Sequence, residues 1–332
     1  MRSALRAADD WLFAAVGPQR LAVFRVMCGA FSVVYVAVRI RRFLDLADAP
    51  AARFDPLGPL APLDSPVSGP LVVSGVVVLL ALGVAFTCGL WFRVTGPLFA
   101  VALLLATTYR SSWGQVLYFE TLMVLHVLIV GFTRSADALS VDARRRGGTA
   151  PAPASPASPA TPATSATSAN PCYGWPIRLA ACVTVLTYVL AGVAKLRIGG
   201  VEWMDGETLR NHVAYSAARL DVLGGSPSPF AEPLLDAAWL FTPLAVATVV
   251  IELAAPVALL GGAVRNVWVV AAWLMHAGIA ALMFVVFPYP LALVAFAPLF
   301  ELERLADGVR SVLGSAIRSD SPTLLGPRPD RN

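Results

Sequence analysis

The feature that most constrains this sequence is a series of long apolar runs separated by short polar segments. Several runs approach or exceed the roughly 18–20 residues that cross a bilayer as a helix. They cover about residues 21–38, 70–90, 95–108, 115–132, 175–196, 237–260 and 264–286, with a short return run at 291–300. The chain has 332 residues, 57% hydrophobic and 14% charged, which is not typical of a soluble domain. Since strand-like alternation is also scarce, we predict an all-α, polytopic transmembrane helical bundle of about seven to eight spans.

One tract of Ala, Pro, Ser and Thr divides the chain. It lies within residues 143–172, and its composition predicts a disordered linker because it cannot bury apolar surface. The expected domains are an N-terminal membrane half at 1–142, the linker at 143–172, a C-terminal membrane half at 173–305 and a polar tail at 306–332. The basic, mildly amphipathic residues 1–20 predict a short helix on the membrane surface ahead of the first span.

The charges indicate topology rather than a nucleic-acid partner. The net charge of +4 is small and lies in the loops. Arginines 144–146 predict a cytoplasmic linker, and counting spans from there places both termini in the cytoplasm, although the arginines at 39, 41, 42 and 53 then fall outside. We therefore expect a multi-pass protein of the cell membrane whose partners are the lipid bilayer and a small lipophilic substrate; a protein partner is not specified.

Ionisable residues inside the apolar runs are the candidates for function, because a charge in a span is costly and usually faces a cavity or a partner. A metal site is not expected, since three histidines without close spacing and four scattered cysteines do not make a ligand set. The candidates are Arg25, Glu120, His126, Lys195, Glu252 and His276.

Lys195 lies where an apolar run gives way to a polar, Gly-rich segment. Such a lysine can keep its ammonium in water as an anchor, or it can enter an apolar cavity, lose its proton more easily and act as a base. Tyr188 precedes it by seven residues and so shares its helix face. Trp203 lies just beyond, where it could close a pocket or belong to an interfacial belt.

Glu252 and His276 lie near the middle of consecutive runs. Pro256 follows Glu252 by four residues and predicts a kink or a loosened helix, because proline cannot donate to the carbonyl of residue 252. Glu252 then either lines a polar pocket or is a protonated carboxyl tied to a neighbouring helix. His276 is either a structural hydrogen-bond donor or, near a carboxyl and a lysine, a group that titrates or binds a ligand.

The other three candidates are more ambiguous. Arg25 lies one turn inside the first run, where it could anchor the helix by reaching the membrane surface or take part in a site. Glu120 and His126 share a run, but a separation of six residues does not stack them on one helix face. Each could form a packing hydrogen bond or belong to a site.

Several of these stretches resemble the HTTM domain, the membrane domain shared by vitamin K-dependent gamma-carboxylase and many bacterial proteins. The most specific is Ala191-Gly-Val-Ala-Lys-Leu followed by Trp203-Met-Asp-Gly206, which is similar to the Ala-Gly-x-x-Lys-Leu…Trp-x-x-Gly signature. Weaker likenesses surround Arg25, Leu139-Ser-Val-Asp142, Ile251-Glu-Leu-Ala-Ala-Pro256, His276 and 287–300, so that the resemblance covers about residues 10–305.

The resemblance implies a role for particular residues. In the carboxylases, the lysine matching Lys195 is regarded as the base that deprotonates reduced vitamin K, so the implied cofactor is a reduced quinone similar to vitamin K hydroquinone. Trp113 matches a tryptophan that a catalytic histidine follows in those enzymes, but here Gln115 and Val116 follow, and the large lumenal domain of the carboxylases has no counterpart. Peptide carboxylation is therefore not the expected reaction.

Our leading hypothesis is an intramembrane pocket for a lipophilic, quinone-like substrate, in a carboxylase-like or quinone-linked membrane enzyme. The predicted catalytic residues are Lys195, Glu252 and His276, and the predicted substrate-binding residues are Arg25, Trp113, Gln115, Glu120, Tyr188 and Trp203. Two alternatives remain at this point: a non-catalytic binding or transport module that uses the same residues, and a structural membrane subunit in which all six ionisable residues are paired and no cavity remains.

Overall fold

The computed structural model of the chain describes residues 2–115, 118–147 and 169–304, and the described residues are helical, without a β-strand among them. Five of the described helices are long and apolar enough to cross a membrane, as a multi-pass helical protein requires. They are α2 (Pro18–Val38), α4 (Gly69–Cys88), α5 (Phe92–Ser111), α8 (Pro171–Gly199, extended by a 3₁₀ segment to Asp205) and α12 (Gly262–Met283). The expected count of seven to eight spans stays a prediction.

Two expected spans are shorter than the sequence pattern indicated. The run at 115–132 forms only α6 (Thr121–Gly131), preceded by a 3₁₀ turn, Tyr118–Glu120. The run at 237–260 forms α11 (Phe241–Leu253), which gives way to a 3₁₀ segment, Ala255–Leu260, around Pro256. The run at 95–108, in contrast, extends to the 20 residues of α5.

Local sequence explains where the long helices begin and end. Asn170 accepts a hydrogen bond from the backbone N–H of Cys172 at 2.9 Å and so caps α8, whose first residue is Pro171. Gly89, in the left-handed region at φ +63°, ends α4. The remaining helices are short: α1 (Arg2–Leu12), α3 (Ile40–Leu44), α7 (Val141–Arg145), α9 (Glu207–Val222), α10 (Ala231–Asp236) and α13 (Pro288–Leu291).

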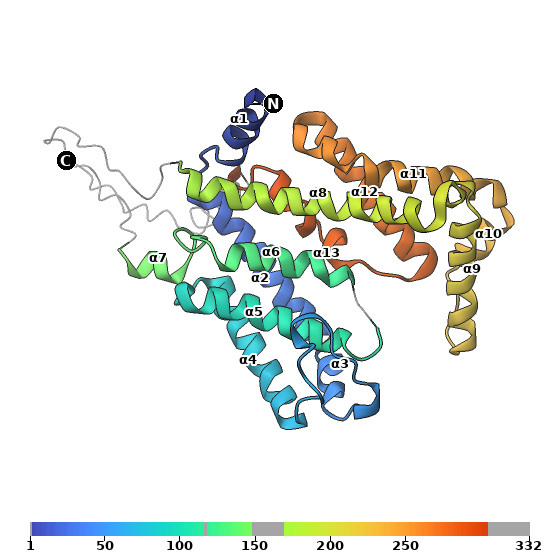
Figure 1. Cartoon of the computed structure of the whole chain (residues 1–332), viewed down its shortest axis with the longest axis horizontal. Helices are drawn as coiled ribbons and strands as arrows, with labels where there is room; N and C mark the ends of the chain where they lie inside the picture. Colours follow the sequence, from blue (N-terminus) through green and yellow to red (C-terminus); the bar gives the residue numbers. More distant parts are fainter. Residues whose placement is uncertain (1, 116–117, 148–168, 305–332) are drawn as a thin grey trace, which may run out of the picture.

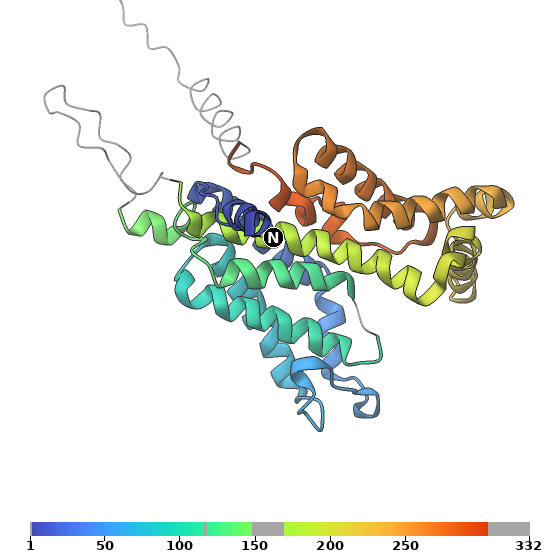
Figure 2. The same ribbon diagram turned by 45° about the horizontal axis from the view of Figure 1, so that its top comes forward.

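Helix α8 lies between the two halves of the bundle. Helices α5 and α6 lie on one side of it and α11 and α12 on the other, while α7 and α9 lie near opposite ends of α8 (Figures 1 and 2). Helices α2, α6 and α11 each pack against α8. The expected halves therefore meet at this helix. Most of the expected linker, at 148–168, and all of the expected tail, at 306–332, lie outside the described residues.

Small residues bring helices close together. A Cβ atom on Gly96 of α5 would lie 2.7 Å from the carbonyl oxygen of Gly131 on α6, so the backbones touch there. A Cβ on Gly192 of α8 would lie 3.1 Å from Cβ of Glu252 on α11. Gly192 thus allows the close approach that brings Lys195, one turn further along α8, to the level of Glu252.

The outer surface of the bundle is apolar. Leu71, Val77 and Val84 on α4 and Val267 and Leu274 on α12 are exposed. Large aliphatic side chains on the outside of long helices suit contact with lipid rather than with water. Five of the six ionisable candidates, all except Lys195, are buried between helices, and their position depends on how the helices pack.

Candidate functional site

Lys195 and Glu252 form an ion pair between α8 and α11. The carboxyl group of Glu252 is almost fully buried, and 23% of the Lys195 side chain is exposed. The ring of Trp203, in the 3₁₀ segment after α8, lies with its centroid 5.6 Å from Nζ of Lys195, a cation–π contact. The ammonium group of Lys195 therefore contacts both the carboxylate of Glu252 and the ring of Trp203.

His276 and Tyr188 form the second polar pair of this region. The hydroxyl of Tyr188 and Nε2 of His276 are 2.8 Å apart and join α8 to α12. The ring of Phe287 lies against the imidazole, with centroids 4.9 Å apart. Tyr188 and Lys195 lie on the same face of α8, as their spacing predicted.

All four residues line one cavity of about 230 Å³. Its other walls are mostly apolar, and Phe119 and Leu122 from the start of α6 contribute to them. Ligand sites commonly combine apolar walls with a few converging polar groups. The cavity is formed by Phe119, Leu122, Thr187, Tyr188, Ala191, Lys195, Glu252, Met275, His276, Ile279, Phe287 and Pro290.

Apart from Nε1 of Trp203, two polar atoms of this site have no hydrogen-bond partner in the described part of the chain. They are Oε2 of Glu252 and Nδ1 of His276, both on side chains that are more than nine-tenths buried. Buried polar atoms are normally satisfied, so an unsatisfied pair beside a cavity indicates a place for a ligand or water. Within the described ranges no three His, Cys, Asp or Glu side chains gather as a metal-ligand group.

A second, apolar cavity lies next to the first. It measures about 360 Å³, lies between α9, α11 and α12, and shares Met275 and Ile279 with the polar cavity. Its lining includes Phe241, Leu244 and Leu282. A polar cavity and an apolar cavity therefore lie on either side of Met275 and Ile279.

The Gly-rich segment after Lys195 has a structural explanation. Gly206 has φ +97°, and a Cβ there would lie 2.5 Å from the backbone nitrogen of Thr242, so only glycine fits. Asp205 accepts a hydrogen bond of 2.8 Å from the N–H of Glu207 at the start of α9. These two residues fix the turn that places Trp203 against Lys195.

The other predicted site residues lie elsewhere. Glu120 is paired through Oε1 with Arg110 at 3.0 Å and with the hydroxyl of Tyr35, and it borders a different cavity, of about 250 Å³, with Oε2 lacking a partner among the described residues. Trp113 packs against Phe54, with ring centroids 5.2 Å apart. Gln115 is exposed. The structure therefore does not bring these three predicted substrate-binding residues to the cavity.

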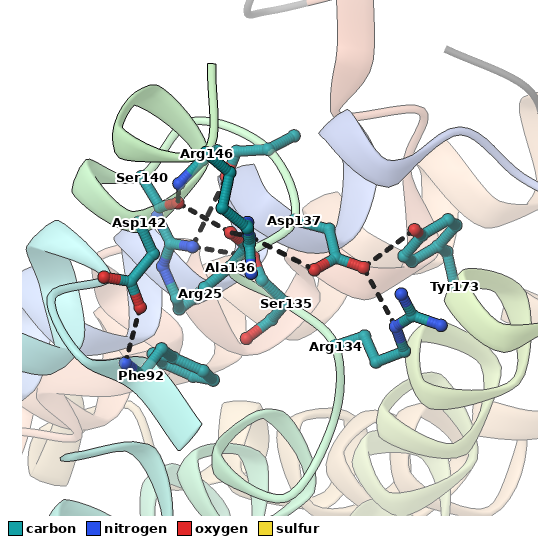
Figure 3. A network of polar contacts seen from close by, with 12 residues as sticks. Arg25, Phe92, Arg134, Ser135, Ala136, Asp137, Ser140, Asp142, Arg146 and Tyr173 are labelled. Atoms are coloured by element: carbon teal, nitrogen blue, oxygen red, sulfur yellow. Dashed lines mark hydrogen bonds and ion pairs between the residues drawn. The ribbon is translucent and has the colours of Figure 1, made fainter. Parts of the chain in front are cut away.

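Arg25 is fully buried and does not reach the membrane surface. Its guanidinium donates hydrogen bonds of 2.7 Å to the carbonyl of Ser135 and 2.6 Å to that of Leu139. Figure 3 shows it among the residues that follow α6, in a network that also contains Asp137 and Asp142. Arg25 therefore fixes the connection between α6 and α7. Neither Arg25 nor these partners line the Lys195 cavity.

His126 is also fully buried and fully used. Its Nε2 lies 3.1 Å from the carbonyl of Ala180 and must donate to it, so Nδ1 accepts from the hydroxyl of Tyr289 at 2.9 Å. Thr184 contacts the same Nε2 at 3.1 Å. His126 therefore belongs to the packing of α6 against α8.

One signal of the site was available in the sequence and was not used. Lys195 is the only lysine in the chain; the other basic residues among the 25 are arginine. Arginine stays charged in proteins, whereas lysine can lose its proton in an apolar environment. Two other contributors to the cavity, Phe119 and Phe287, come from turns whose position no helical periodicity predicts.

Comparisons with known proteins do not help to interpret this site. No protein-family model matches this chain, and neither a curated protein nor a solved structure was found to be similar to it.

Proposed function

We propose that this is an HTTM-type integral membrane protein that binds a lipophilic, quinone-like molecule in the Lys195 cavity and removes a proton from it. The observation that carries the proposal is the convergence of Lys195, Glu252, His276 and Tyr188 on one cavity beside an apolar cavity. The resemblance of residues 191–206 to the HTTM signature supports the same assignment.

The groups present suit a reduced quinone. Such a molecule has weakly acidic hydroxyls on a flat ring and an apolar remainder, and when bound it would supply the acidic proton. The free Oε2 of Glu252 and Nδ1 of His276 offer partners for the hydroxyls. The aromatic ring of Phe287 suits a flat ring, and the neighbouring apolar cavity suits the remainder of the molecule.

The ion pair suggests how a base could arise. Transfer of one proton along the hydrogen bond from Lys195 to Glu252 converts the pair into a neutral amine and a carboxylic acid, which a low dielectric favours over two charges. The amine of Lys195 can then accept the proton of the ligand hydroxyl. Lys195 then carries the proton of the ligand as an ammonium beside the ligand anion, and Glu252 keeps the proton that it took from Lys195.

The cavity also separates this proposal from a purely structural role. The ionisable residues of the runs are paired, as a structural subunit would require, but a cavity remains and two buried polar atoms beside it are unsatisfied. A binding or transport module with the same residues differs from the proposal only in the proton step.

The single lysine allows a direct test. Purified protein in nanodiscs is treated with an amine-specific acylating reagent, and modification of Lys195 is followed by mass spectrometry of its peptide. Arg197→Lys supplies a matched reference amine, exposed and two residues away. We expect a naphthohydroquinone kept reduced under nitrogen to protect Lys195 and not the reference amine, and the bound hydroquinone to show the absorbance of its anion.

Two results would contradict the proposal. Equal acylation of Lys195 with and without the hydroquinone would remove both the binding and the base role. Protection of Lys195 without the absorbance of the hydroquinone anion would remove the base and favour the binding or transport alternative.

A further inference from the structure

Another cavity lies at the other end of the bundle, away from the Lys195 cavity. It measures about 540 Å³ and lies between the start of α5 and the connection from α6 to α7. Its lining includes Arg93, Arg134, Arg146, Asp137 and Asp142. Nothing in the proposed function uses this cavity.

The two carboxylates of the cavity are occupied within the protein. Asp142 accepts hydrogen bonds from the backbone N–H groups of Trp91 at 2.9 Å and Phe92 at 2.7 Å, at the N-terminus of α5. Asp137 accepts from Arg134 at 2.9 Å and from the hydroxyl of Tyr173 at 2.9 Å (Figure 3). The acidic groups therefore do not make this a cation site.

The arginines outnumber these carboxylates. Arg146 lies 3.4 Å from the second oxygen of Asp137, so Asp137 holds two arginines, while Arg93 has no hydrogen-bond or ion-pair partner in the described ranges. Three guanidinium groups facing two carboxylates leave a net positive charge at the cavity. Guanidinium groups bind phosphate oxygens well because their donors match the geometry.

The surroundings of the cavity are those of a membrane interface. Trp91 and Phe132, beside it, are 68% and 62% exposed, as expected of aromatic residues at the boundary of a bilayer. From this end, exposed apolar side chains continue along one face of α5 at Val94, Leu98, Val101 and Leu105. A molecule whose phosphate lies among the arginines could lay its acyl chains along this stripe.

We propose that this cavity binds the phosphate of an anionic phospholipid, with Arg93, Arg134 and Arg146 as its ligands and the α5 stripe against its acyl chains. The stripe selects a lipid over a soluble phosphate, because only a lipid contacts the arginines and the apolar face together. Asp137 competes with the phosphate for two of the three arginines. The bound lipid would hold the connection between α6 and α7 against α5.

The test uses the purified full chain in detergent, titrated with phosphatidylglycerol or phosphatidylcholine, with bound lipid counted by native mass spectrometry. We expect tighter retention of phosphatidylglycerol. Arg93→Gln should weaken it about five-fold, and Arg93→Gln with Arg134→Gln by about ten-fold or more. Asp137→Asn keeps an acceptor for Tyr173 but frees two arginines, and should strengthen retention about five-fold.

The matched control is Arg197→Gln. Arg197 is exposed, lies in the last turn of α8 and does not line this cavity, so its substitution should leave retention unchanged. Equal retention of the two lipids would overturn the proposal. So would an Arg197→Gln effect equal to that of Arg93→Gln, or a loss of retention in Asp137→Asn. Displacement of the lipid by an equal concentration of inorganic phosphate would assign the cavity to a soluble anion instead.

Discussion

His126 and His276 offer the most instructive comparison in this molecule. Each lies in an apolar helix and each hydrogen-bonds a tyrosine hydroxyl, at 2.9 Å for Tyr289 and 2.8 Å for Tyr188. The second nitrogen of His126 donates to the carbonyl of Ala180, but the second nitrogen of His276 has no partner in the described residues. His126 is 0% exposed and His276 is 7% exposed and borders a cavity.

The same contrast separates two carboxylates. Both oxygens of Asp142 accept backbone hydrogen bonds at the start of α5. Glu252 uses one oxygen for Lys195 and keeps the other without a partner. A polar group whose bonding capacity is exhausted inside the fold contributes to structure, whereas one with spare capacity beside a cavity is available to a ligand.

The largest effect is expected for His126→Ala. It removes a fully buried ring with two satisfied nitrogens and leaves a void, which should lower the free energy of unfolding by about 3 kcal/mol. His276→Ala is the same chemical change, but it removes only one hydrogen bond and lies beside an existing cavity. It should lower the free energy of unfolding by about 1 kcal/mol. SDS titration of the protein in micelles, followed by tryptophan fluorescence, measures both. Equal decreases in the free energy of unfolding for the two variants would show that the two histidines do not differ in this way.

A smaller effect is expected for Lys195→Met. It leaves the Glu252 carboxyl without its partner and should cost about 2 kcal/mol, less than the ~3–5 kcal/mol of a fully buried pair because the lysine is partly exposed. Lys195→Met with Glu252→Leu should recover most of this loss, because it removes both charges together. Neither variant should bind the hydroquinone. Retained binding in the double variant would show that the ion pair is structural.

His276→Ala should also affect ligand binding. The lost imidazole removes one polar contact in the cavity, so hydroquinone affinity should fall about ten-fold, which is ~1.4 kcal/mol. The measurement is the concentration of hydroquinone that protects Lys195 from acylation. Those molecules of His126→Ala that remain folded should be protected at the wild-type concentration. A fall in affinity for His126→Ala alone would reverse the roles of the two histidines.

The smallest effect concerns Asp142 and pH. Desolvation acts to raise the pKa of Asp142, but hydrogen bonds from the amides of Phe92 and Trp91, with nearby arginines, outweigh it and hold the pKa below its ordinary value. A lowered folded-state pKa adds stability that is present above about pH 4 and is lost as the pH falls through the folded value. Asp142→Asn should therefore cost at most about 1 kcal/mol at pH 7. The difference from wild type should shrink below pH 4 in the same SDS titration, and a difference independent of pH would contradict the assignment.

Part of the site could be predicted because helical periodicity is local. Tyr188 and Lys195 share a face of α8 by spacing alone, and Pro256 marks the place where α11 gives way to a 3₁₀ segment. Arg25 could not be placed in this way. Its partners are carbonyls of Ser135 and Leu139, which belong to a connection whose course depends on the packing of other helices.

By itself the sequence determined that the chain forms apolar helices long enough to cross a membrane, and it placed polar residues on them. Helix α6 begins only at Thr121 because residues Tyr118–Glu120 form a 3₁₀ turn, which hydrophobicity does not predict. Only the tertiary structure decided which polar residues meet, since the rotation of each helix is fixed by several neighbours at once. It set Lys195 on α8 against Glu252, 57 residues away, and it closed the surroundings of His126 while leaving a cavity beside His276.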